Sequence, residues 1–93
     1  MSQRSDLTSP RHWVHYLYFP EEADARRAGA AITAAGWEIQ ALEPAVEGTS
    51  WVVVPEQHDA VVSESAVVAA RQFFEDVAAR VPGAEYDGWE ASA

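Results

Sequence analysis

The stretch Trp13-Val-His-Tyr-Leu-Tyr-Phe19 decides the fold of this chain. It is rich in aromatic and β-branched residues and contains no glycine or proline, so it favours an extended strand. Its apolar side chains occupy both odd and even positions, which is typical of a strand covered on both faces in the middle of a sheet. Pro20 has no backbone N–H to donate to a neighbouring strand, and it therefore ends this one.

A helix and an edge strand are expected next. Pro20-Glu-Glu22 is a favourable helix start, because proline fits the first turn and acidic side chains complement the helix dipole. Small apolar residues at helical spacing predict a helix from Glu21 to Ala35, and Gly36 suits the left-handed position that ends it. Trp37 to Leu42 then alternates apolar and polar residues, as an edge strand does.

The second half of the chain has a similar order. Ser50-Trp-Val-Val-Val54 is apolar on both faces and predicts a second central strand, followed by a connection over residues 55–62. Apolar residues recurring every three or four positions predict a helix from Glu64 to Arg80, with Ser63 as its N-cap. The segment Ala84 to Ala91 predicts a closing strand.

The resulting order β-α-β-β-α-β indicates an α+β, ferredoxin-like fold. Two split β-α-β units with right-handed crossovers give one four-stranded antiparallel sheet with both helices on one face. The first and third strands then lie in the middle, in agreement with their two-sided apolar pattern. Residues 1–11 are polar and are expected to form a flexible N-terminal arm, with residues 12–93 as a single domain.

Composition and charge limit the possible functions. Six arginines, no lysine and 15 acidic residues give a net charge of -9 in 93 residues. Affinity for phosphate groups requires surplus cations, so the charge argues against direct binding of nucleic acid or an anionic membrane. The absence of cysteine excludes disulfides and cysteine nucleophiles. No secretory segment or bilayer-spanning run is recognisable, and a cytoplasmic protein is expected.

The segment Glu85-Tyr-Asp-Gly-Trp89 has two interpretations. In a regular strand Glu85, Asp87 and Trp89 share one face, although a glycine inside a strand often marks a bulge. In the first, Tyr86 fills the core, the acids face solvent and Trp89 covers the end of the sheet. Alternatively, Glu85, Asp87 and Trp89 belong to a recognition surface, because partly exposed aromatic residues are typical interface anchors.

The chain resembles the regulator of ribonuclease activity B family of ribonuclease E inhibitors. The resemblance rests on Glu85-Tyr-Asp-Gly-Trp89, on Phe19 before an acidic helix start, and on Gly36-Trp-Glu-Ile39. It implies a ferredoxin-like domain that binds the endoribonuclease and restrains it without being an enzyme. The family's N-terminal helical segment and long acidic tail have no counterpart in this sequence.

The helix-free face of the sheet is a second candidate surface. If Leu17 and Phe19 face the helices, then Val14, Tyr16 and Tyr18 point the other way. From the other central strand they are joined either by Trp51 and Val53 or by Val52 and Val54. Such a face is too apolar to be left to solvent, so the arm, a second copy of the chain or a partner protein is expected to cover it.

Other residues give weak indications of chemistry. His12 and His15 are three apart on a strand, hence on opposite faces, and cannot chelate one metal ion. His58 beside Asp59, in the expected connection, could help to bind a cation, but these two residues alone are not a metal-binding motif. No metal site, cofactor or catalytic residue is predicted, because no phosphate-binding glycine loop or nucleophile motif is present.

The leading hypothesis is a non-catalytic domain that binds a protein partner through an acidic and partly aromatic surface, with ribonuclease E as the candidate partner. Its predicted contacts are Glu85, Asp87 and Trp89, with Tyr16, Tyr18 and Trp51 on the open sheet face and Glu21, Glu22 and Asp24 as further candidates. The alternative is a homodimeric ferredoxin-like module that is either structural or binds a small ligand between Tyr16, Tyr18 and Trp51 of apposed sheets.

Overall fold

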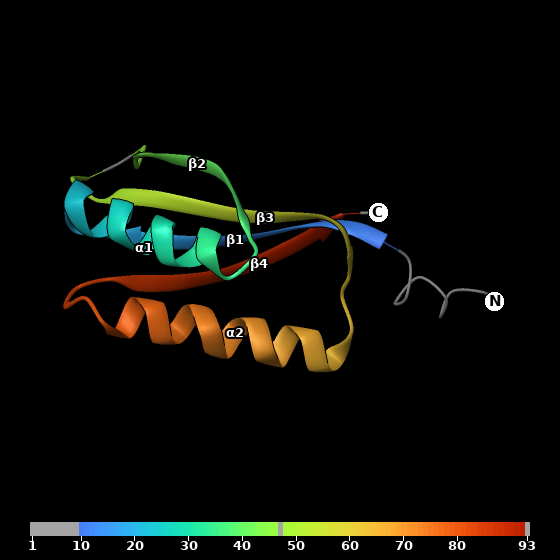
Figure 1. Cartoon of the computed structure of the whole chain (residues 1–93). Coiled ribbons are helices and arrows are strands. Elements are labelled where there is room, and N and C mark those ends of the chain that lie inside the picture. The colour runs from blue at the N-terminus through green and yellow to red at the C-terminus, as the bar shows by residue number, and fades with distance from the viewer. Residues whose placement is uncertain (1–9, 47, 93) are drawn as a thin grey trace.

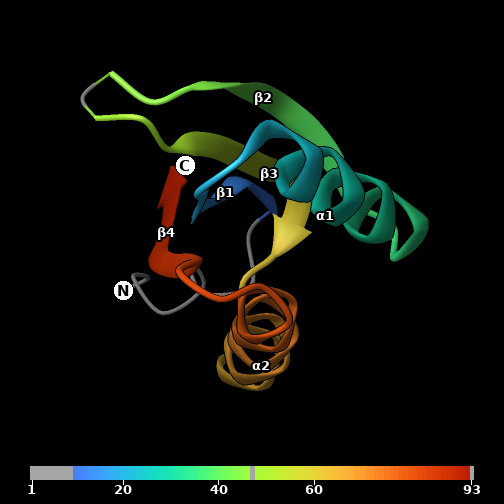
Figure 2. The ribbon, with the colours of Figure 1, turned by 90° about the vertical axis from the view of Figure 1, so that its left-hand side faces the viewer.

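The computed structural model describes residues 10–46 and 48–92 and has the expected order of elements (Figure 1). These are β1 (Pro10–Phe19), α1 (Glu22–Ala34), β2 (Glu38–Pro44), β3 (Trp51–Val61), α2 (Glu64–Ala79) and β4 (Glu85–Ser92). The strands form one antiparallel sheet in the order β2-β3-β1-β4. Both helices lie on the same side of this sheet, α1 beside β2 and β3, and α2 beside β4 (Figure 2). The α+β ferredoxin-like prediction is confirmed.

The helices begin and end for the reasons that the sequence suggested. Ser63 caps α2, where its hydroxyl accepts a hydrogen bond from the backbone N–H of Ala66 at 3.2 Å. Gly36 follows α1 with a φ of 103°, and its N–H donates to the carbonyl of Thr33 at 3.0 Å. No helix among the described residues is long and apolar enough to cross a membrane.

The core lies between the sheet and the helices. Leu17 and Phe19 of β1 and Val53 of β3 are fully buried there against the apolar stripes of the two helices. Ile32 of α1 and Phe74 of α2 close the same layer. The alternation of β1 therefore places its odd-numbered residues toward the helices, as predicted.

The third strand is twice as long as the sequence indicated. We expected a connection over residues 55–62, but β3 runs from Trp51 to Val61. Pro55 is buried inside this central strand, where it pairs with Ile39 of β2. The register of β2 shifts directly after that pair, so the missing N–H of the proline falls at an irregular point of the ladder, where proline is tolerated.

The first strand is also longer than predicted. It begins at Pro10, so Pro10 and Arg11, which were assigned to the N-terminal arm, pair with Val61 and Ala60 of β3. The rest of the predicted arm, residues 1–9, lies outside the described residues.

A β-bulge in β4 changes which of its residues share a face. Tyr16 is opposite Gly88, whereas Leu17 is opposite Tyr86, so Asp87 is an extra residue in the ladder. Gly88 has a φ of 115°, a backbone conformation that residues with a Cβ rarely adopt. After the bulge Trp89 is opposite His15, on the helix side. The prediction that Glu85, Asp87 and Trp89 share one face is therefore wrong for Trp89.

Replacing Gly88 by alanine tests the bulge. A Cβ at this position meets no neighbouring atom within 4 Å, so the cost comes from the backbone conformation alone. We expect Gly88→Ala to lower the free energy of unfolding by about 1–2 kcal/mol in urea denaturation. A synthetic chain with D-alanine at position 88 is the control and should keep the wild-type stability, because D-residues favour positive φ. Equal losses for the two alanines would contradict a conformational cause.

Candidate functional site on the open sheet face

The sheet face that no helix covers, called the open face below, is built from alternate residues of all four strands. In β1 these are the even-numbered residues from His12 to Tyr18, and the registers assign the remaining members. Tyr18 is opposite Val52 of β3 and Glu85 of β4, and Val14 is opposite Glu56 and Glu90. Of the two alternatives for β3, the structure selects Val52 and Val54.

Trp51 lies on the other side of the sheet. It is opposite Phe19 and packs against the helix-side core. The expected grouping of Tyr16, Tyr18 and Trp51 on the open face is therefore wrong, and these three side chains do not line one pocket. The error has a simple cause: in an apolar run such as 51–54 both alternations fit the sequence, and only the register with β1 chooses between them.

The open face is acidic around an apolar centre. Val14, Val54 and the two tyrosines lie along its middle. The four arginines whose side chains are described all lie on α1, on α2 or at the C-cap of α2. Among the side chains that the structure describes, arginine is thus confined to the helix layer, and the acidic residues of the open face are Glu38, Glu43, Glu56, Glu85 and Glu90.

Four of the six predicted contact residues meet at one place. Tyr16, Tyr18, Asp87 and Trp89 line a shallow hollow beside β4, together with Glu90. The Tyr16 hydroxyl donates a hydrogen bond to Glu90 Oε1 at 3.2 Å. Burial of the hydroxyl, with Glu90 next to it, raises the pKa of Tyr16, so the ring stays neutral and keeps its proton for that bond. The hollow combines aromatic surface with carboxylates.

Trp89 is partly exposed at the margin of the aromatic residues of the core. The residue is 37% exposed, and its ring meets that of the buried Trp13 edge-to-face at 6.0 Å. It therefore packs onto the end of the sheet and also borders the hollow.

The looser predicted contacts lie on the helix side of the molecule. Glu21 and Asp24 line the groove between the two helices, and Asp24 forms an ion pair with Arg27. Glu22 pairs with Arg26, its neighbour one helical turn later. The structure does not bring these acids together with the residues of the open face.

The most unusual buried group is His15, which no pattern in the sequence marked as a core residue. It is fully buried between Trp13, Trp37 and Phe74, with ring centroids 4.4–4.9 Å apart. Its Nδ1 lies 2.8 Å from the hydroxyl of Tyr86, while Nε2 has no hydrogen-bond partner among the described residues. Burial lowers the pKa of His15 to about 4 and raises that of Tyr86 to about 12, so this pair is neutral.

This small antiparallel α+β domain presents acidic and aromatic side chains on one sheet face, and exposed aromatic residues of this kind are typical of interaction surfaces. The family model described as regulator of ribonuclease activity B matches residues 1–91. The chain belongs to this family, and the resemblance noted in the sequence is confirmed. The family is a regulatory, non-catalytic one that acts on ribonuclease activity. No match was found among curated proteins.

Burial of His15 predicts a loss of stability in mild acid. Below about pH 6.5 the unfolded chain takes up a proton at this ring, whereas the folded protein does so only near pH 4. Stability falls as the pH falls through that window, by about 2 kcal/mol from this residue between pH 7 and pH 5. An NMR titration of the His15 ring should give a midpoint near pH 4. In urea denaturation, His15→Phe should lose less free energy of unfolding between pH 7 and pH 5 than the wild type does.

A substitution without a titratable group provides the control. Val68 is exposed on α2, and Val68→Gln should keep the wild-type loss of stability between the same two pH values, because it leaves the His15 ring and every other titratable group in place. A His15 midpoint near 6.5, or equal pH dependence in the wild type and His15→Phe, would contradict a buried neutral ring.

Proposed function

We propose that the protein binds ribonuclease E and restrains RNA cleavage, with the open face and the adjoining bulge of β4 as its docking surface. Membership of the regulator family over residues 1–91 is the observation that carries this proposal. The described structure supports the location, because it separates an acidic, partly aromatic face from a helix layer that carries arginines.

The physical chemistry of this face suits a basic protein surface. Clustered carboxylates and a net charge of -9 steer a positively charged partner toward the domain and accelerate encounter. The rings of Tyr16 and Tyr18 offer large, rigid contact area, and residues of this type supply most of the affinity in protein interfaces. Glu85 and Asp87 flank these rings along β4 and are both exposed.

The arrangement also suggests how inhibition works. An enzyme that cleaves RNA must hold phosphates with cationic groups. Carboxylates presented from a rigid sheet can occupy such groups in place of RNA, so the domain competes with the substrate without cutting anything. The edge strand β4 carries the bulge and places Asp87 at the margin of the hollow, where a partner can reach it.

Charge reversal on β4 tests the docking surface. The double variant Glu85→Arg/Asp87→Arg should weaken binding to purified ribonuclease E by about 1.4 kcal/mol or more, roughly tenfold in Kd, by calorimetry. Tyr16→Ala should cost more than about 1 kcal/mol. Cleavage of a labelled RNA should slow with excess wild-type protein and recover with these variants.

Glu75 provides a matched control on the helix layer. It is exposed on α2, and Glu75→Lys changes a charge far from the open face. It should bind as tightly as the wild type. A stronger loss for Glu75→Lys than for the β4 double variant would overturn the location. Absence of both a complex and inhibition would overturn the function, and a stable dimer that buries the open face in sedimentation would favour the homodimeric alternative.

A further inference from the structure

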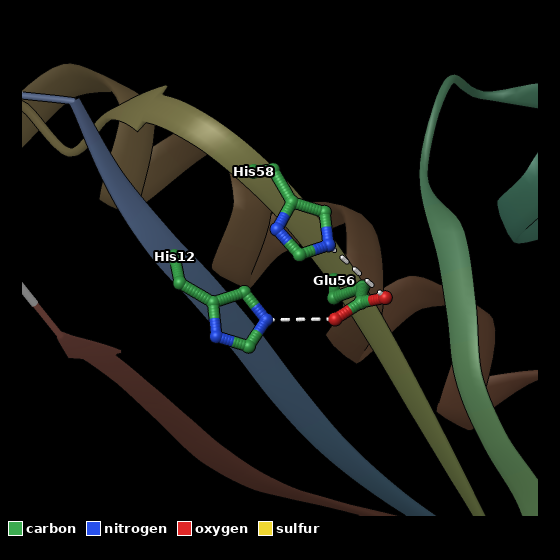
Figure 3. Close-up of side chains that lie close together, drawn as sticks. All are labelled: His12, Glu56 and His58. Atoms are coloured by element: carbon green, nitrogen blue, oxygen red, sulfur yellow. Dashed lines mark hydrogen bonds and ion pairs between the residues drawn. The ribbon is translucent and has the colours of Figure 1, made fainter.

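Three side chains that could bind a metal ion meet at one end of the open face. His12 comes from β1, and Glu56 and His58 come from β3 (Figure 3). Their ligand atoms all lie within 4.8 Å of one another. His12 and His58 are 46 positions apart in the sequence, and only the extension of β3 beyond Pro55 brings them together.

Both imidazoles point at the same carboxylate. His12 Nε2 lies 2.7 Å from Glu56 Oε1, and His58 Nε2 lies 3.4 Å from Glu56 Oε2. The two rings are stacked, with centroids 4.7 Å apart and planes at 7°. The Gln40 amide donates a hydrogen bond to Glu56 Oε1 at 3.1 Å and helps to hold the carboxylate in place.

The backbone explains this convergence. Glu56 and His58 are two positions apart on a strand and therefore share a face. The register between β1 and β3 shifts after Arg11, and Asp59 there has a φ of 56°, so a bulge lies directly beside His12. Bulges re-aim side chains, and this one directs His12 and His58 toward the same point.

We propose that His12, Glu56 and His58 bind one Zn²⁺ ion on the open face of the sheet. Some zinc sites have three protein ligands and a fourth position that holds water or another ligand. Two imidazole nitrogens and one carboxylate are a known set of three such protein ligands. With metal–ligand bonds of about 2.0–2.1 Å, tetrahedral geometry separates ligand atoms by roughly 3.3 Å. The His58–Glu56 distance of 3.4 Å already matches, and the three ligand atoms lie within 4.8 Å of one another.

Burial and charge favour such an ion. The Glu56 side chain is 13% exposed, while His12 and His58 are 37% and 56% exposed, so a metal can enter from solvent onto an already positioned carboxylate. Glu38 is opposite Glu56 in the register, which adds negative potential near the site.

A bound ion has consequences for the rest of the protein. It joins the beginning of β1 to the far end of β3 and adds two positive charges to one end of an acidic face. The site lies apart from Glu85 and Asp87 at the other end of β4, so zinc binding does not depend on docking to a ribonuclease.

Calorimetric titration of the untagged protein with zinc chloride tests the proposal. We expect one ion per chain, and a visible Co²⁺ absorption spectrum of tetrahedral intensity when cobalt replaces zinc. His12→Gln and His58→Gln should each weaken zinc binding by at least roughly 10–100-fold. That is the loss of metal affinity when a residue that only supports a ligand is removed, and a ligand itself should matter at least as much. In NMR spectra of the wild type, the ring signals of His12 and His58 should shift with zinc while those of the buried His15 do not.

Glu43→Gln is the matched control, because it removes one exposed carboxylate from the open face away from the triad. It should bind zinc as the wild type does. All variants should keep the far-UV circular dichroism of the wild type, since the two histidines are partly exposed. No zinc-induced heat, or equal affinity in the histidine variants and Glu43→Gln, would overturn the site.

Discussion

Antiparallel pairing of β1 with strands on both of its sides is the constraint on which the rest of the structure depends. It commits every odd-numbered residue from Trp13 to Phe19 to the core and every even-numbered residue to the open face. A slip of one residue would exchange the two sets and place Tyr16 and Tyr18 against the helices. The fully buried side chains of Leu17 and Phe19 make such a slip costly.

Two bulges then modify this regular alternation, one beside the proposed docking surface and one beside the proposed zinc site. The bulge at Asp87 and Gly88 turns Trp89 back toward the core while Asp87 borders the hollow of the open face. The irregularity near Asp59 brings His58 beside His12. In both places one extra residue decides which side chains become neighbours, and sheet edges with bulges commonly carry such specialised roles.

The distribution of charge follows from the same two-layer design. Arginines on the helices pair with acids three or four positions away, as in Glu22–Arg26 and Asp24–Arg27, so the helix layer is close to balanced there. Among the described side chains, no arginine lies beside the exposed glutamates Glu43 and Glu85 of the sheet, so these carboxylates stay available. A partner with basic groups therefore meets different surfaces on the two sides of this domain, even though both are rich in acidic residues.

The sequence by itself determined the order of elements, the two central strands, the Ser63 cap and the family, because these depend on local composition, spacing and the Glu85–Trp89 motif. It could not determine the face of Trp51 or Trp89, the length of β3, or the meeting of His12 with His58. Those depend on register and on bulges, which arise from hydrogen bonds between strands distant in the chain. A glycine at position 88 indicated a bulge, but only the pairing of β4 with β1 showed that Trp89 after it faces the helix side.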